Sequence, residues 1–327
     1  MKRALASLLI PLLFLTACGG SGSGAGTGNN VPPPSAAIAI TPTNGMQVSQ
    51  VAYQAVVSSG EIADLAGDSG LTAGTSGNIA KATISRKAAG TLSIVVQQVP
   101  VGPINLPCAV DGSLTVSANL ANPLTLSAGD TITAEYMDCD DGIGEIIDGT
   151  LSFVVDAFDG DILSGLYAMT MTMELIDFQV TTAEDVLMAS GDGTATLDTL
   201  LAPYVEASVR GDAMVSDSNS GSEALTYYSS AQTFDGRLDP APYTLIASAT
   251  LDSSRLAGSI VYSTPVTFEG LGENYPNRGE LLVEGMNSSA RLIAEENGID
   301  VTIEIDSDGD TVIDDTILTT WAELAAM

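Results

Sequence analysis

The chain has 327 residues, and its 41 acidic side chains against 10 basic ones, with no histidine, give a formal net charge of −31. The absence of histidine excludes Ser-His-Asp and Cys-His catalytic systems, imidazole bases and His-ligated zinc sites. Nucleic acid is excluded as a partner, because phosphate binding needs clustered Lys and Arg. Hydrophobic residues make up 45% of the chain and aromatic residues 5%. This composition indicates a folded domain built mainly from small aliphatic side chains.

Residues 1–17 have the organisation of a signal peptide. Lys2 and Arg3 form a basic start, and the mostly apolar run that follows to Ala17 is too short to span a bilayer. The run ends in Leu15-Thr16-Ala17-Cys18, which resembles the lipobox of bacterial lipoproteins, where the cysteine is lipidated before cleavage. The resemblance implies that Cys18 carries the acyl chains of a membrane anchor. Gly19 after the cysteine resembles the sorting signal of enterobacterial lipoproteins, which implies the outer membrane of a Gram-negative bacterium.

A flexible tether is predicted over residues 18–35. The segment from Gly19 to Asn30 contains six glycines, and prolines at 32–34 follow it. Such a tether lets the folded part stand off the membrane by roughly 20 to 30 Å. Attachment through lipid fits the composition, because so acidic a chain offers no basic membrane-binding face. The predicted location is therefore the cell envelope, with the membrane as partner through the lipid anchor. Any small-molecule or protein partner stays open.

Residues 36–327 are predicted to form a single β-rich domain with one short helix near its start. The helix is expected over residues 46–58, because five small apolar residues fall on one helical face there. They are Val48, Val51, Ala52, Ala55 and Val56. A Gly/Ser-rich stretch follows at residues 67–77.

Beyond about residue 90 the apolar residues recur with period two, the pattern of half-buried antiparallel strands. Strands are predicted at 92–97, 131–137, 149–158, 167–175, 195–198, 204–209, 243–251, 258–268, 280–284, 290–294 and 301–305. The adjacent apolar residues Leu175 and Ile176 predict a β-bulge. Asp-Gly pairs, such as those beginning at Asp148, Asp159 and Asp192, predict turns. The chain from Pro100 onward is therefore predicted to be a β-meander of about ten strands. It would form a large antiparallel curved sheet, a sandwich or an open barrel.

Two cysteines remain once Cys18 is assigned to lipid. Cys108 and Cys139 are an even pair in an oxidising compartment, which predicts a structural disulfide. They lack the CxxC spacing of a redox-active pair.

The sharpest motif lies near the end of the chain. Three carboxylates at alternate positions are followed by a fourth four residues later. This spacing resembles the calcium loops of EF-hand and related DxDxD proteins. The expected ligands are Asp306, Asp308, Asp310, the carbonyl of Val312, and Asp314. Thr311 stands where the family has glycine, Ile317 where it has a bidentate glutamate, and the residues before the loop look like a strand. The sequence thus predicts a weak calcium site of about millimolar affinity. An unoccupied acidic hairpin turn stays open as the alternative.

A second resemblance covers the last part of the chain. The run from Gly279 to Gly285, the DxDGD loop and Thr319-Thr320-Trp321 are similar to the C-terminal part of a class of proteobacterial lipoproteins, and this similarity implies no activity. Trp321, the one tryptophan, is expected to anchor the core.

Three functions are weighed. The leading one is a lipid-anchored cell-envelope protein of structural or binding role, without catalytic activity and with calcium as its one cofactor. The alternative is a periplasm-facing carrier of an apolar ligand, because flexible methionines suit an adaptable apolar cleft. That hypothesis rests on a stripe of alternate residues, Tyr167, Met169, Met171 and Met173, for which a packed core is the commoner explanation. A glycosidase using two carboxylates is less favoured.

Overall fold

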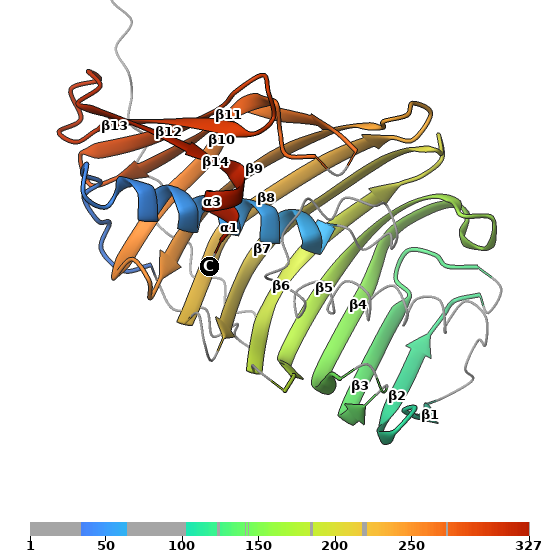
Figure 1. Cartoon of the computed structure of the whole chain (residues 1–327). Helices are drawn as coiled ribbons and strands as arrows, with labels where there is room; N and C mark the ends of the chain where they lie inside the picture. Colours follow the sequence, from blue (N-terminus) through green and yellow to red (C-terminus); the bar gives the residue numbers. More distant parts are fainter. Residues whose placement is uncertain are drawn as a thin grey trace, which may run out of the picture.

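The structure is a computed structural model that describes residues 34–63, 103–122, 125–140, 142, 144–183, 186–217, 221–272 and 274–326 (Figure 1). The predicted signal peptide, Cys18, nearly all of the tether, the Gly/Ser-rich stretch at 67–77 and the strand at 92–97 lie outside these residues.

One antiparallel sheet of 14 strands makes up most of the described chain. Each strand pairs with the next one in sequence, so the order in space is the order along the chain. The strands are β1 (Ile104–Pro107), β2 (Asp111–Asn119), β3 (Thr131–Asp140), β4 (Ile146–Asp161), β5 (Leu166–Thr181), β6 (Val186–Asp198), β7 (Tyr204–Asp217), β8 (Gly221–Asp235), β9 (Pro242–Ser253), β10 (Gly258–Leu271), β11 (Arg278–Gly285), β12 (Ser288–Ala294), β13 (Asp300–Asp306) and β14 (Asp315–Thr320).

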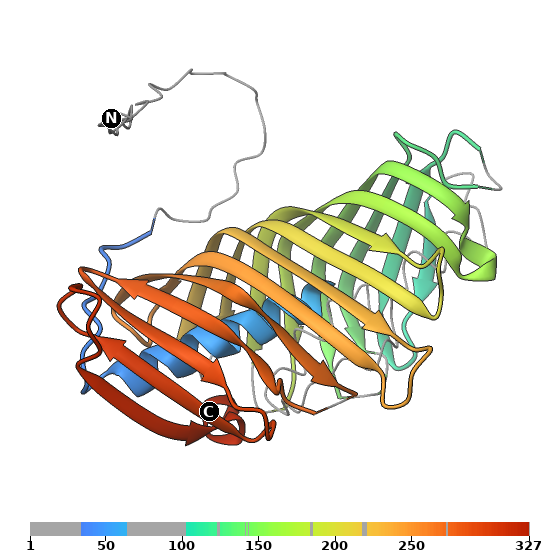
Figure 2. The same cartoon turned by 90° about the horizontal axis from the view of Figure 1, so that it is seen from above.

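The mainly β fold and the meander are confirmed. Among the described strands β1 and β14 do not pair, so the sheet stays open, and it curves strongly along its length (Figures 1 and 2). The bulge expected at Leu175 and Ile176 is present, since the pairing of β5 with β6 shifts between Leu175 and Phe178. Four strands, β1, β2, β8 and β14, were not predicted.

Three Asp-Gly pairs that predicted turns lie inside strands instead, two in β4 and one in β6. A Cβ atom on Gly149 would lie 2.4 Å from the carbonyl oxygen of Asp177 on β5, and one on Gly193 would lie 2.7 Å from that of Arg210 on β7. Glycine at these positions lets the neighbouring backbone approach closely rather than reversing the chain. The turn prediction was wrong for these pairs.

The helix α1 (Gly45–Ala63) contains the predicted 46–58 and extends beyond it. The five small apolar residues of its predicted face are at most 1% exposed. They pack α1 onto the concave side of the sheet, against β7 to β9 and β11 to β13 (Figure 2). Arg255, after β9, holds the helix to the sheet, because its guanidinium donates to Gln54 of α1 and pairs with Glu223 of β8.

The chain ends in a short helix, α3 (Trp321–Ala325), which a capping box begins. Thr320 Oγ1 accepts from the Glu323 N–H, and the Glu323 carboxylate accepts from the Thr320 N–H. The box fixes the first turn of α3 and directs Trp321 inward, where its side chain is fully buried. The expectation that Trp321 anchors the core is confirmed.

Candidate metal centre

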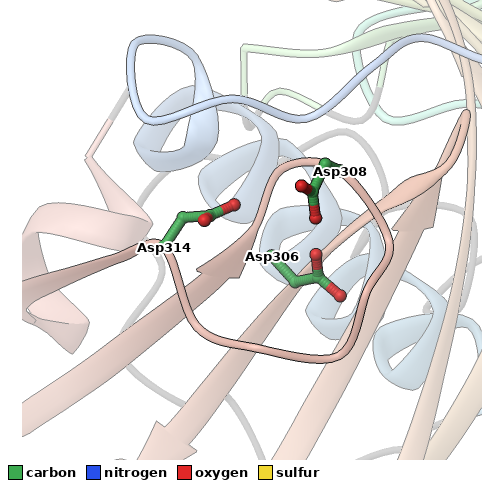
Figure 3. Close-up of side chains that lie close together, drawn as sticks. All are labelled: Asp306, Asp308 and Asp314. Carbon is green, nitrogen blue, oxygen red and sulfur yellow. The ribbon is translucent and has the colours of Figure 1, made fainter.

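The acidic loop lies between β13 and β14, where it closes the last hairpin (Figure 3). Carboxylate oxygens of Asp306, Asp308 and Asp314 come within 4.8 Å of one another. Asp306, at the end of β13, is 6% exposed, and the other two are exposed. The predicted spacing therefore brings three of the four carboxylates together. As expected, the element before the loop is a strand and not a helix.

Hydrogen bonds within the loop hold two of the three carboxylates, those of Asp306 and Asp314. Asp306 accepts from the backbone N–H of Gly309 at 2.7 Å and of Thr311 at 2.9 Å. Asp314 accepts from the backbone N–H and the hydroxyl of Ser307. These two bonds hold the pKa of the Asp314 carboxyl below its usual range. Both bonds to Asp314 go to its Oδ2, which leaves Oδ1 outside them, and each oxygen of Asp306 accepts one of the bonds named, so lone pairs remain for a cation.

Thr311 adopts the backbone conformation that calcium loops give to glycine. Its φ is 71°, a left-handed value that is rare for a β-branched residue. Threonine therefore keeps a left-handed conformation at the position where the family has glycine. Three converging carboxylates supply the kind of oxygen ligand that a hard cation takes.

One predicted ligand is placed differently. The carboxylate of Asp310 is not part of the triad, and its Oδ1 accepts from the backbone N–H of Val312 at 2.8 Å. Ile317, at the position of the family's glutamate, lies in β14. The loop thus supplies fewer side-chain ligands than a complete EF-hand.

The predicted disulfide is present. Cys108, just before β2, is bonded to Cys139 of β3, with the two Cα atoms 5.5 Å apart. The bridge ties the turn between β1 and β2 to the third strand, at one end of the sheet.

The apolar stripe of β5 belongs to the packed core. Met169, Met171 and Met173 are 3%, 1% and 9% exposed, and Tyr167 is half-buried with its ring stacked on Phe158 at 6.0 Å between centroids. A cavity of about 610 Å³ lies along β4 to β8, and of the four residues only Met169 lines it. A packed core accounts for the stripe.

Sequence reasoning did not find the other residues of this cavity, which include Phe158, Leu197 and Gln232. They come from separate strands and meet only through the register of the sheet.

The register of the sheet also brings together Asp192 and Asp212, which lie directly opposite each other on β6 and β7. Burial, and next the charge of Asp212, raise the pKa of Asp192. Because the two residues of such a pair lie on different strands, their spacing along the chain does not predict the contact.

Among the residues that the structure describes, no helix is both long enough and apolar enough to cross a membrane. Comparison of the chain with protein-family models, with curated proteins and with solved structures finds no match.

Proposed function

We propose that the protein is a lipid-anchored component of the bacterial cell envelope with a binding role and no catalytic activity. Calcium occupies the loop between β13 and β14. The observation that carries the calcium assignment is the convergence of Asp306, Asp308 and Asp314 within 4.8 Å. The anchor assignment rests on the lipobox at Leu15 to Cys18.

Calcium suits this loop for an electrostatic reason. Three carboxylates held close together repel one another, and a divalent cation between them relieves that repulsion. Because the ion binds the folded loop, it stabilises the folded state by mass action. In the envelope, calcium at the concentration that a weak site requires would close the last hairpin of the sheet.

Calcium is expected to raise the melting temperature of the protein. For a site of millimolar affinity, 10 mM calcium adds about 1.4 kcal/mol to the free energy of unfolding. This corresponds to roughly 2 °C for a chain of this size. Magnesium at the same concentration should act less, because it gives up its waters reluctantly. Differential scanning calorimetry in the two salts measures the difference.

The control is a pair of variants of equal charge. Asp306→Asn with Asp308→Asn should erase the difference between calcium and magnesium. Glu284→Gln with Glu296→Gln, at exposed positions outside the loop, should keep it. If the two double variants respond to calcium alike, the loop is an acidic turn and the assignment fails.

Removing the sulfur of Cys18 is expected to abolish lipidation. Cys18→Ala should lose all label when cells are grown with an alkyne-bearing fatty acid, and the protein should leave the membrane fraction. A Cys108→Ala variant keeps Cys18 and should retain the label. Equal labelling of Cys18→Ala and wild type would remove the anchor from the proposal.

A further inference from the structure

The sheet ends at β14, and no described strand pairs with the outer edge of that strand (Figure 2). Trp321, directly after β14, donates its backbone N–H to the carbonyl of Ile299 at 3.0 Å and so continues the register of β14 with β13. In an antiparallel pair, residues that bond the neighbouring strand alternate with residues whose N–H and C=O face away from it. The backbone N–H groups of Thr316, Leu318 and Thr320 therefore point to the open edge.

Carboxylates cap two of these three outward donors. Asp315 Oδ1 accepts from the Thr316 N–H at 2.9 Å, and Glu323 Oε2 accepts from the Thr320 N–H at 3.2 Å. The Thr319 hydroxyl also donates to Glu323 Oε2, at 2.6 Å, and so holds that carboxylate in place. Among the described residues, no side chain caps the middle donor in this way.

Without these caps, β14 would suit pairing with another chain, because an open edge strand is a template for a further strand. Residues 316–320 are threonine, isoleucine and leucine, with no charge among them, and Leu318 is 79% exposed. A second β14, laid antiparallel with Leu318 opposite Leu318, would bring Thr316 opposite Thr320. Such a pair needs the outward N–H groups of all three residues.

The two caps oppose this pairing in two ways. They occupy the donors at both ends of the edge, which leaves a second strand only the middle one. They also place a negative oxygen where a carbonyl oxygen of the second strand would have to lie, and hydrogen bonds to a carboxylate are stronger than those to a carbonyl. At the other end of the sheet, β1 has four residues and includes Pro107, and short edge strands and proline also limit pairing.

We propose that Asp315 and Glu323 keep the protein from associating with a second copy of itself through β14. Glu323 then has two roles, since it also belongs to the capping box of α3. The proposal is independent of calcium, because neither residue belongs to the triad of Asp306, Asp308 and Asp314.

Sedimentation velocity tests the proposal on the full chain with Cys18→Ala, which removes only the proposed anchor. Salt at about 1 M screens the repulsion between two acidic chains. This protein should be a monomer. Adding Asp315→Ala and Glu323→Ala removes both caps and should double the molar mass at the same concentration.

The matched control is Asp315→Asn with Glu323→Gln. It removes the same two charges but keeps an acceptor oxygen at each position, so it should stay a monomer. Dimerisation of this control to the same extent as the alanine pair would assign the effect to charge and overturn the proposal.

The backbone of Leu318 supplies the second test. Leu318→Pro, added to the alanine pair, removes the middle N–H without removing a bond to β13, and it should restore the monomer. Leu318→Val keeps that N–H and should leave the dimer. A dimer that survives Leu318→Pro would overturn the proposal, because it would not form through this edge.

A single variant guards against loss of α3. Asp315→Ala leaves the capping box of α3 intact and frees one end of the edge, so it should already show a dimer where the capped protein shows none. Circular dichroism melting identifies which variants fold. A folded alanine pair that stays a monomer would overturn the proposal, and if the alanine pair does not fold, a monomeric Asp315→Ala would do so.

Discussion

Replacing Trp321 by alanine is expected to lower the free energy of unfolding by about 3 to 5 kcal/mol, the usual cost of removing a buried aromatic side chain. Its ring is fully buried, at centroid distances of 4.7 Å from Tyr53, 5.7 Å from Phe268 and 6.3 Å from Tyr275. Its Nε1–H donates to the carbonyl of Pro276 at 2.9 Å. The side chain therefore joins α1, β10 and the loop after β10.

The measurement is thermal unfolding by circular dichroism, in which Trp321→Ala should melt roughly 5 to 10 °C below wild type. Tyr227→Ala is the matched control, because that aromatic ring is 83% exposed and its loss removes little buried area. Trp321→Phe should fall between the two, since it keeps a ring and leaves the Pro276 carbonyl without its donor. If Trp321→Ala melts with wild type, Trp321 does not anchor this end of the core.

Loss of the disulfide is expected to cost about 3 to 4 kcal/mol. Cys108 and Cys139 are 31 residues apart, and closing a loop of that length restricts the unfolded chain by this amount in the chain-entropy treatment. Urea unfolding of the variant Cys108→Ser with Cys139→Ser should therefore show a lower midpoint than wild type. The slope of the transition reports any change in the unfolded state.

Reduction supplies the control for this prediction. A thiol reductant should lower the urea midpoint of wild type to that of the double serine variant and leave the variant unchanged. A reductant-insensitive midpoint in wild type would contradict a stabilising bridge.

The fold was predictable where strands bury one face and expose the other. On β5 the alternation of Met169, Met171 and Met173 with threonines is clean, and the strand was found. On β8 a bulge breaks the period, because the pairing with β9 shifts between Thr226 and Ser229. That strand was missed. At Gly149 and Gly193 the Asp-Gly pairs predicted turns, but both residues lie inside strands. Glycine is required there because a neighbouring strand approaches closely.

Residues of the candidate sites were predictable only where they lie close together in the sequence. The convergence of Asp306, Asp308 and Asp314 was predictable because all three belong to one short loop, and the spacing along the chain fixes their distances. The cavity along β4 to β8 was not predictable. Its residues are far apart in sequence, and only the register of the finished sheet brings them together.

The described N-terminal segment joins the sheet near the strands at its C-terminal end, far from β1. Ala37 forms a parallel bridge with Ser259 at the start of β10, and the Ile38 carbonyl accepts from Met286 after β11 (Figure 2). Strands lie about 4.8 Å apart, so the nine steps from β10 to β1 cover about 43 Å. β1 and the disulfide are therefore at the end of the sheet far from the strands that the N-terminal segment joins. A partner that contacts β1 would lie about 40 Å along the sheet from one that contacts β10.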